Sequence, residues 1–277
     1  MGLIFYDTET TGTETFFDQI LQFAAIKTDE NLREVDRFEI RSRLQPHIVP
    51  APRAVLVTGV KVSQLTDTSL PSHYEMVRSL QETLASWSPA LFIGWNSIQF
   101  DEDLIRQALY KTLHNPYLTN RDGNSRTDAM RMAQACSVFA CGALTIPTDK
   151  LGKKIFRLED VALGNGFRNG HAHDAMADVE ATLFLCRVIL EKAPDVWSSF
   201  MRFSSKAAVA SFITEEPTFC LSDFYFGQPF SWICTTLGQN DGNSAEWYVY
   251  NLEIDPSEIL PLCELDLVAR LTDACKI

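Results

Sequence analysis

The chain has 277 residues, 46% of them hydrophobic, which is enough for one large domain or for one domain with a smaller partner. Its seven cysteines include no Cys-x-x-Cys pair, which argues against a disulfide framework or a zinc site and for a reducing, cytoplasmic environment. No apolar run approaches a membrane span, and the short apolar start ends at Asp7, unlike a signal peptide. The formal net charge of −12 weighs against a polyanionic ligand.

The N-terminal segment predicts a buried strand that ends in acidic residues. Residues 3–6 are apolar or aromatic, and Asp7-Thr-Glu9-Thr-Thr-Gly follows them. Because alternate residues of a strand share a face, Asp7 and Glu9 point the same way at its end. Two such carboxylates repel each other unless a cation lies between them, and hard divalent ions prefer oxygen ligands. Asp7 and Glu9 are therefore predicted metal ligands.

Residues 19–28 and 35–43 predict two further strands, which form a meander with the first. Prolines 46, 50 and 52 then break regular structure, and the apolar segment 55–60 by itself indicates a buried hairpin fragment. Ser72 starts a predicted helix that ends at Trp87. Its apolar positions, which we expect in the core, are Tyr74, Met76, Val77, Leu80, Leu84 and Trp87.

A second apolar strand, residues 91–94, is followed by a helix over 102–113, with Asp101 at the junction. Open α/β sheets bind ligands at such junctions, so Asp101 is a third candidate ligand. For Trp95, which follows the strand, packing is favoured over stacking on a base.

From residue 114 to 157 the pattern is looser. We expect a polar turn over 120–124, a helix over about 127–139 and a loop over 143–154. Residues 158–163 predict a short helix, which the glycines at 164 and 166 end.

The next helix, which is predicted to end near residue 190, opens with Asp174 as its capping acid and carries Asp178 one turn later. His171 and His173 precede it. Taken alone, this pattern favours a surface acid, a capping acid and a histidine with no special role over a functional site, by about two to one.

Three motifs together change that interpretation. Asp7-x-Glu9, Phe100-Asp101 and His173-x-x-x-x-Asp178 have the order and spacing of the DEDDh-type 3′→5′ exonucleases. The chain resembles this group over about residues 1–195 and, within it, the bacterial exonuclease I family. The closer likeness rests on the segments Gln22-Phe-Ala-Ala-Ile, Ala54-Val-Leu-Val-Thr-Gly-Val60, Asn124-Ser-Arg126, Phe156-Arg-Leu-Glu159 and His173-Asp-Ala-Met-Ala-Asp178.

The resemblance implies an α/β fold of the ribonuclease H-like kind, with the Asp7 strand at the centre of a mixed sheet and helices on both faces. It implies that two divalent cations, Mg²⁺ with Mn²⁺ able to substitute, are held by Asp7, Glu9, Asp101 and Asp178. His173 would be the general base, selected over His171 by the family's spacing. Asp128 would support or cap rather than bind metal. The implied substrate contacts are Thr10, Leu56, Thr58, Asn96, Ser125, Arg126 and Arg157.

The C-terminal part changes character. Tryptophans and tyrosines between Gly/Asn/Asp turns indicate short antiparallel strands over residues 205–277. In the resembling family an SH3-like domain follows the nuclease domain. We therefore expect two domains: an exonuclease domain over 1–195, and a partial SH3-like β domain over 205–277 with accessory nucleic-acid binding.

The expected function is metal-dependent 3′→5′ hydrolysis of single-stranded DNA from a free 3′ end, which yields 5′-mononucleotides. A single-strand DNA-binding protein is a possible partner, and a monomer is favoured. One alternative is the same chemistry on RNA or short oligonucleotides, as in ribonuclease T or oligoribonuclease. Another is a catalytically inactive nucleic-acid-binding module. The net charge opposes all three, although bound metal and base stacking on aromatic side chains reduce that objection.

Overall fold

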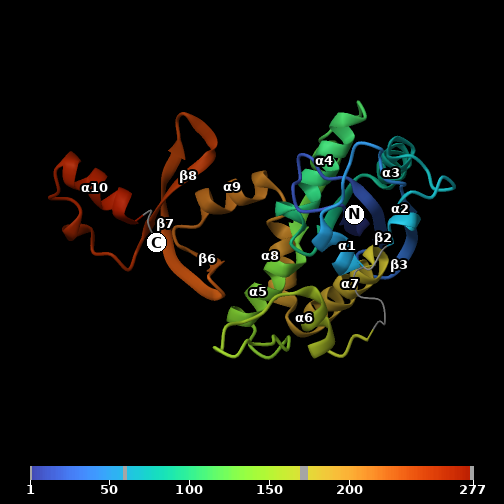
Figure 1. Cartoon of the computed structure of the whole chain (residues 1–277). Coiled ribbons are helices and arrows are strands. Elements are labelled where there is room, and N and C mark those ends of the chain that lie inside the picture. The colour runs from blue at the N-terminus through green and yellow to red at the C-terminus, as the bar shows by residue number, and fades with distance from the viewer. Residues whose placement is uncertain (1, 59–60, 169–173, 275–277) are drawn as a thin grey trace. The chain divides into compact units, whose positions relative to one another are not determined.

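The computed structural model describes residues 2–58, 61–168 and 174–274, and it divides into two compact units, residues 1–206 and 207–277 (Figure 1). A five-stranded sheet of order β3-β2-β1-β4-β5 forms the centre of the first unit. β1 and β2 pair antiparallel, as do β2 and β3, whereas β4 and β5 run parallel to their neighbours. The mixed sheet predicted around the Asp7 strand is confirmed. Its strands are β1 (Gly2–Thr10), β2 (Ile20–Thr28), β3 (Glu34–Arg41), β4 (Ala90–Gly94) and β5 (Ser125–Asp128).

Helices cover both faces of this sheet, because β1 is apolar on both sides. Leu3 and Phe5 pack into one core, and Ile4 and Tyr6 pack into the other. The second core is closed by α3 (His73–Trp87) and α4 (Asp101–Lys111). The first is closed by α5 (Ala129–Phe139), α6 (Leu158–Gly164), α7 (Ala175–Lys192) and α8 (Pro194–Arg202).

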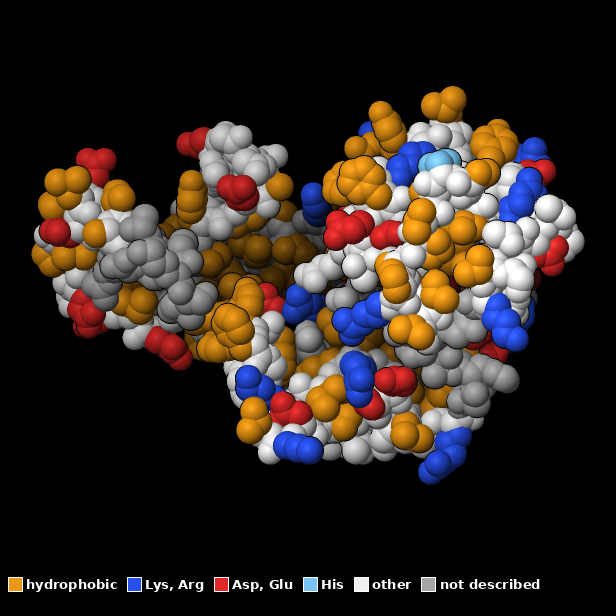
Figure 2. All heavy atoms as spheres, in the orientation of Figure 1, with side chains coloured by type: hydrophobic (Ala, Val, Ile, Leu, Met, Phe, Trp, Pro, Cys, Tyr) orange, Lys and Arg blue, Asp and Glu red, His pale blue; other side chains and the backbone are white. Residues whose placement is uncertain are grey.

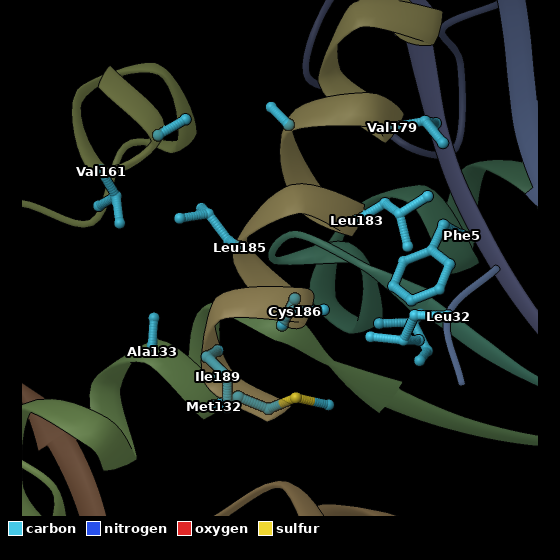
Figure 3. Close-up of a cluster of buried hydrophobic side chains, with 14 of the residues drawn as sticks. Phe5, Leu32, Met132, Ala133, Val161, Val179, Leu183, Leu185, Cys186 and Ile189 are labelled. Carbon is cyan, nitrogen blue, oxygen red and sulfur yellow. The ribbon is translucent and has the colours of Figure 1, made fainter. Parts of the chain in front are cut away.

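Helix α7 is the main element of the first core. Figure 3 shows Val179, Leu183 and Cys186 on the part of α7 that faces Phe5 of β1, while Leu185 points toward α6. Each of these side chains is at most 3% exposed. Burying a large apolar side chain contributes about 1.5–3 kcal/mol, so this packing fixes the start of α7 relative to β1.

The segment after β3 differs from its prediction. Residues 55–58 belong to helix α1 (Pro52–Thr58), not to a buried hairpin fragment, and Leu56 is 81% exposed. Pro52 at the first helical position is preorganised for a helix, and a short apolar run does not by itself distinguish helix from strand. A second short helix, α2 (Val62–Leu65), follows.

Two further expectations were wrong in detail. The polar residues 125–128 form strand β5, so the helix expected from Thr127 begins at Ala129. Tyr74, expected in the core of α3, is 51% exposed and lies 6.0 Å from the ring of His114. The other five positions named for that helix are buried, as predicted. Two 3₁₀ turns, η1 (Ser97–Gln99) and η2 (Leu118–Asn120), complete the region.

The expected end of the first domain, residue 195, falls inside α8. Pro194 opens this helix, and Val196 and Trp197 are buried in the core that α7 also builds. The first compact unit therefore extends to Lys206, beyond the expected boundary at residue 195.

The second unit contains a three-stranded antiparallel sheet of order β6-β7-β8, in agreement with the expected small β domain. The rings of Phe212 and Phe219 pack against each other with their centroids 6.1 Å apart. Its elements are α9 (Lys206–Glu215), β6 (Phe219–Tyr225), β7 (Gln228–Asn240), β8 (Asn243–Asn251), η3 (Pro256–Glu258) and α10 (Glu264–Ala274). Among the described residues, none of the helices combines the length and the apolar character needed to span a bilayer.

Candidate functional site

Asp7 and Glu9 lie on the α7 face of β1, near its carboxyl end. They continue the alternation of Leu3 and Phe5, whose side chains pack against the core that α7 builds. Both acids are half-buried, whereas Thr8 between them points to the opposite face and is buried. The predicted shared face of the two carboxylates is therefore present.

Asp178 comes to these two acids from the first turn of α7. One carboxylate oxygen from each of Asp7, Glu9 and Asp178 lies within 4.8 Å of the other two. Three oxygens at such separations can bind one cation together. Residues 171 positions apart in the chain meet here because α7 packs along β1 and β2.

The start of α7 is fixed by Asp174, as its capping role predicts. The Asp174 carboxylate accepts hydrogen bonds from the backbone N–H groups of Met176 and Ala177. It is also held from the sheet, by Arg41 Nη2 at 2.6 Å and by Gln22 Nε2 at 3.1 Å. Sequence reasoning missed both sheet contacts, since nothing in the local pattern links β2 and β3 to a residue more than 130 positions away.

Asp101 approaches from the other face of the sheet and is outside the group of three. It is the first residue of α4, it is 4% exposed, and it accepts a hydrogen bond from Thr8 Oγ1 at 2.5 Å. The next residue, Glu102, is also buried. It accepts from the Tyr6 hydroxyl at 2.7 Å, from Thr119 Oγ1 at 2.6 Å and from Arg126 Nη1 at 2.8 Å. This satisfied network anchors the start of α4, and with it Asp101.

Burial raises the pKa values of three of these carboxylates, and the neighbouring negative charges add to the rise at Asp7 and Glu9. Burial, followed by the charges of Asp101, Asp178 and Glu9, raises the pKa of Asp7 well above its ordinary value. Burial and then the charge of Asp178 raise the pKa of Glu9 to about 7. Burial also raises the pKa of Asp101 to about 7, although the Thr8 hydroxyl opposes the rise. Asp101 is therefore electrostatically part of the site even though its oxygens lie outside the group of three.

These residues fit a divalent cation. The donors are all carboxylate oxygens, which suit hard ions such as Mg²⁺ and Mn²⁺ better than softer metals. A bound cation also offsets the burial and the mutual repulsion that raise the pKa values of Asp7 and Glu9. The arrangement is therefore a candidate metal centre.

A pocket of about 580 Å³ adjoins Asp178. Its lining joins apolar side chains to the polar residues predicted as substrate contacts, Asn96 and Arg157. The full lining is Trp95, Asn96, Met130, Phe156, Arg157, Leu158, Glu159 and Asp178. The Arg157 side chain is 68% exposed and pairs with Asp160 at 2.6 Å. Pockets of this size bind small organic ligands in many proteins.

The backbone at Asn96 is held by Asp128. The Asp128 carboxylate accepts from the N–H groups of Asn96 at 3.0 Å and Met130 at 2.9 Å. Burial, the largest effect, raises the pKa of Asp128 above its ordinary value. Its predicted role as a capping acid is confirmed.

The other predicted substrate residues lie in different settings. Thr10 is buried and its hydroxyl donates to the Gly12 carbonyl, Ser125 is in β5, and Arg126 is paired with Glu102. Leu56 projects from α1, and Thr58 is the last residue of that helix. The predicted base His173 and its rival His171 lie outside the described residues.

Comparisons with known proteins agree with this geometry. A ribonuclease H-like domain whose central strand ends in a carboxylate cluster has the architecture of a metal-dependent nuclease domain. A family model described as Exonuclease (RNase_T) matches residues 4–185. The chain belongs to this Exonuclease family.

Individual relatives share the fold and part of the sequence. Exodeoxyribonuclease I of Buchnera aphidicola subsp. Acyrthosiphon pisum is 30% identical over 207 residues, which are 74% of this chain and 50% of that protein. A solved exonuclease I from Methylocaldum szegediense is 28% identical with a TM-score of 0.81, covering 96% of this chain and 57% of that one. E. coli exonuclease I in complex with a dA16 oligonucleotide is 25% identical with a TM-score of 0.80, covering 94% and 57%. The chain thus spans about half the length of the curated relatives it matches.

Proposed function

We propose that this chain is a divalent-metal-dependent 3′→5′ exonuclease that degrades single-stranded DNA to 5′-mononucleotides. The observation that carries the proposal is the convergence of Asp7, Glu9 and Asp178 at the end of the central strand. Membership of the Exonuclease family supports the reaction class. The preference for DNA rests on relatives named exodeoxyribonuclease I and on the E. coli structure with a DNA oligonucleotide.

Asp7, Glu9 and Asp178, with Asp101 beside them, would hold two divalent cations, Mg²⁺ or Mn²⁺. Such a pair lowers the pKa of the attacking water and stabilises charge on the leaving 3′ oxygen. Two neighbouring residues preorganise these ligands before a substrate binds. Thr8 orients Asp101 through a hydrogen bond, and Asp174 caps the first turn of α7, which carries Asp178.

A proton acceptor is also needed. His173, five residues before Asp178, is our proposal for the general base that takes the proton of the attacking water. The motif spacing of the resembling family supports it over His171. Both residues precede Asp174, the cap of α7, in the sequence.

Of the proposed substrate contacts, Arg157 and Asn96 have the strongest support, because they line the pocket that Asp178 also lines. Arg126 is paired with Glu102, so a phosphate contact by Arg126 would have to share its guanidinium with that acid. Thr10, Leu56, Thr58 and Ser125 remain predictions from the resemblance, as do a monomeric state, a single-strand DNA-binding protein as partner and a cytoplasmic location.

The distribution of charge reduces the objection that the acidic composition raises. Residues 207–277 contain 11 acidic and two basic residues, so they account for −9 of the net charge of −12. Residues 1–206 carry 25 acidic and 22 basic residues, a net of −3, and the acids include the four proposed ligands. On the face of the first unit shown in Figure 2, Lys and Arg side chains alternate with acidic ones. The first unit is therefore the part of the chain best suited to a polyanion.

The test uses 5′-labelled single-stranded DNA and RNA of one sequence, each with Mg²⁺ or with EDTA. We expect a ladder that shortens DNA from its 3′ end, requires Mg²⁺ and stops at a 3′-terminal block. His173→Ala should slow it at least a hundredfold, since general bases contribute about 10²–10⁴-fold, whereas His171→Ala should not. A ladder on RNA alone would assign the chain to the ribonuclease branch. Binding of DNA without any degradation would refute catalysis.

A further inference from the structure

We propose that Trp95 is a positioning residue for the pocket beside Asp178, and that its indole N–H sets how tightly a nucleotide binds there. The inference deepens the proposed function and rests on it. It concerns a residue for which packing was favoured over stacking on a base.

Trp95 has little freedom in where it lies. It follows β4 directly, and the chain turns sharply on either side of it. A Cβ on Gly94 would meet Ser97 Cβ at 2.4 Å and the Tyr6 carbonyl at 3.1 Å, so only glycine fits. Asn96 adopts a left-handed backbone with φ 59°, and its N–H is held by Asp128. The backbone of Trp95 is therefore held in one position at the carboxyl end of β4.

From that place the indole reaches a distant segment of the chain. Trp95 Nε1 donates a hydrogen bond to the Phe156 carbonyl at 2.9 Å, across 61 residues. Phe156 and Arg157 precede α6, and a bond to the backbone fixes the path of the chain independently of the Phe156 side chain. The segment that carries Arg157 is thereby tied to the end of β4.

This tie matters for ligand binding because both of its ends line the pocket. Trp95, Phe156 and Arg157 form walls of the space that Asp178 also lines. Arg157 itself is mostly exposed, and its ion pairs are with Glu159 and Asp160 in the first turn of α6, which it precedes. The Trp95 hydrogen bond is therefore a direct link between two walls of the pocket.

The chain offers a matched control. Trp87, at the end of α3, also donates an indole hydrogen bond to a distant partner, Asp36 Oδ2 at 3.1 Å across 51 residues. It packs in the core on the α3 and α4 face and does not line the pocket. Trp→Phe at either position removes an N–H donor and keeps an aromatic ring.

The experiment compares W95F and W87F with the wild type in the full chain. The readouts are KM and kcat on single-stranded DNA, and the Kd of thymidine 5′-monophosphate with Mg²⁺ by calorimetry. For W95F we expect KM and Kd to rise about fivefold, the effect of one hydrogen bond, with kcat within twofold. W87F should lower Tm and leave KM and Kd unchanged.

Unchanged KM and Kd in W95F, or equal changes in W87F, would overturn the assignment and leave the proposed function intact. If the wild type degrades no nucleic acid but W95F still weakens nucleotide binding, the proposed function fails and the role of Trp95 stands. A wild type that binds no thymidine 5′-monophosphate overturns the assignment.

Discussion

Replacing Glu9 with glutamine should stabilise the metal-free protein at neutral pH. Burial and the neighbouring charge of Asp178 raise the pKa of Glu9 from 4.5 to about 7. Because each pKa unit corresponds to about 1.4 kcal/mol, ionised Glu9 weakens the metal-free fold by about 3 kcal/mol above pH 7. In a unit of this size that is roughly 6–12 °C in Tm.

The pH dependence follows from the sign of the change. The pKa is higher in the folded state, so the contribution of Glu9 to stability is fully present below pH 4.5 and is lost as the pH rises through about 7. The advantage of Glu9→Gln should therefore be absent near pH 4.5 and complete near pH 8. Saturating Mg²⁺ should narrow the difference, because only the wild type retains all its ligands; at a hundredfold Kd it gains about 2.7 kcal/mol, which offsets most of the advantage of the variant.

The assay is thermal unfolding of both proteins in EDTA and in Mg²⁺, at pH 5 and pH 8. A glutamine variant that is less stable than the wild type in EDTA at pH 8 would refute the reasoning. So would a difference that is the same at both pH values, since that would have no connection with ionisation.

Three other substitutions test the elements that hold the site. Thr8→Val removes the hydroxyl that keeps the pKa of Asp101 down, so the Mg²⁺ concentration for half-maximal rate should rise about tenfold; an unchanged metal titration would contradict this. Asp174→Ala should cost about 1–2 kcal/mol and lower kcat, whereas Asp174→Asn keeps the helix cap and should recover much of the Tm. Glu102→Leu leaves Arg126 without its buried partner and should cost about 3–5 kcal/mol in urea unfolding. A loss equal to that of Glu102→Gln would argue against this network.

The sequence predicted the structure best where a short local pattern, such as the alternation of side chains along a strand or the cap of a helix, determines it. The apolar run over residues 3–6 predicted a buried strand, and the acids that follow it were predicted to share a face, because alternate residues of a strand point the same way. The central position of that strand came from the family resemblance. The capping acid Asp174 likewise located the start of α7 and, one turn later, Asp178. The positions of Asp7, Glu9 and Asp178 on their elements follow from rules that operate within one turn or one pleat, whereas the role of Asp178 as a ligand came from the resemblance.

The rest depends on contacts between distant segments. β5 consists of polar residues and is a strand only because it pairs in parallel with β4. The segment 52–58 carries too few residues to show a period, so a strand and a helix were equally compatible with it. Arg41 and Gln22 contact Asp174, and Trp95 contacts Phe156. These contacts join segments far apart in the chain, and no local sequence pattern predicts that such segments meet.

The most direct test of the account is a calorimetric titration of Mg²⁺ and Mn²⁺ into the wild type, Asp7→Asn and Asp178→Asn, with the exposed loop acid Asp67→Asn as control. We predict saturable binding by the wild type and by the control. We also predict that each of the two site variants weakens binding by at least tenfold and, in parallel, loses hydrolysis of single-stranded DNA. Site variants that bind metal as the wild type does would contradict the assignment of these carboxylates as the metal centre.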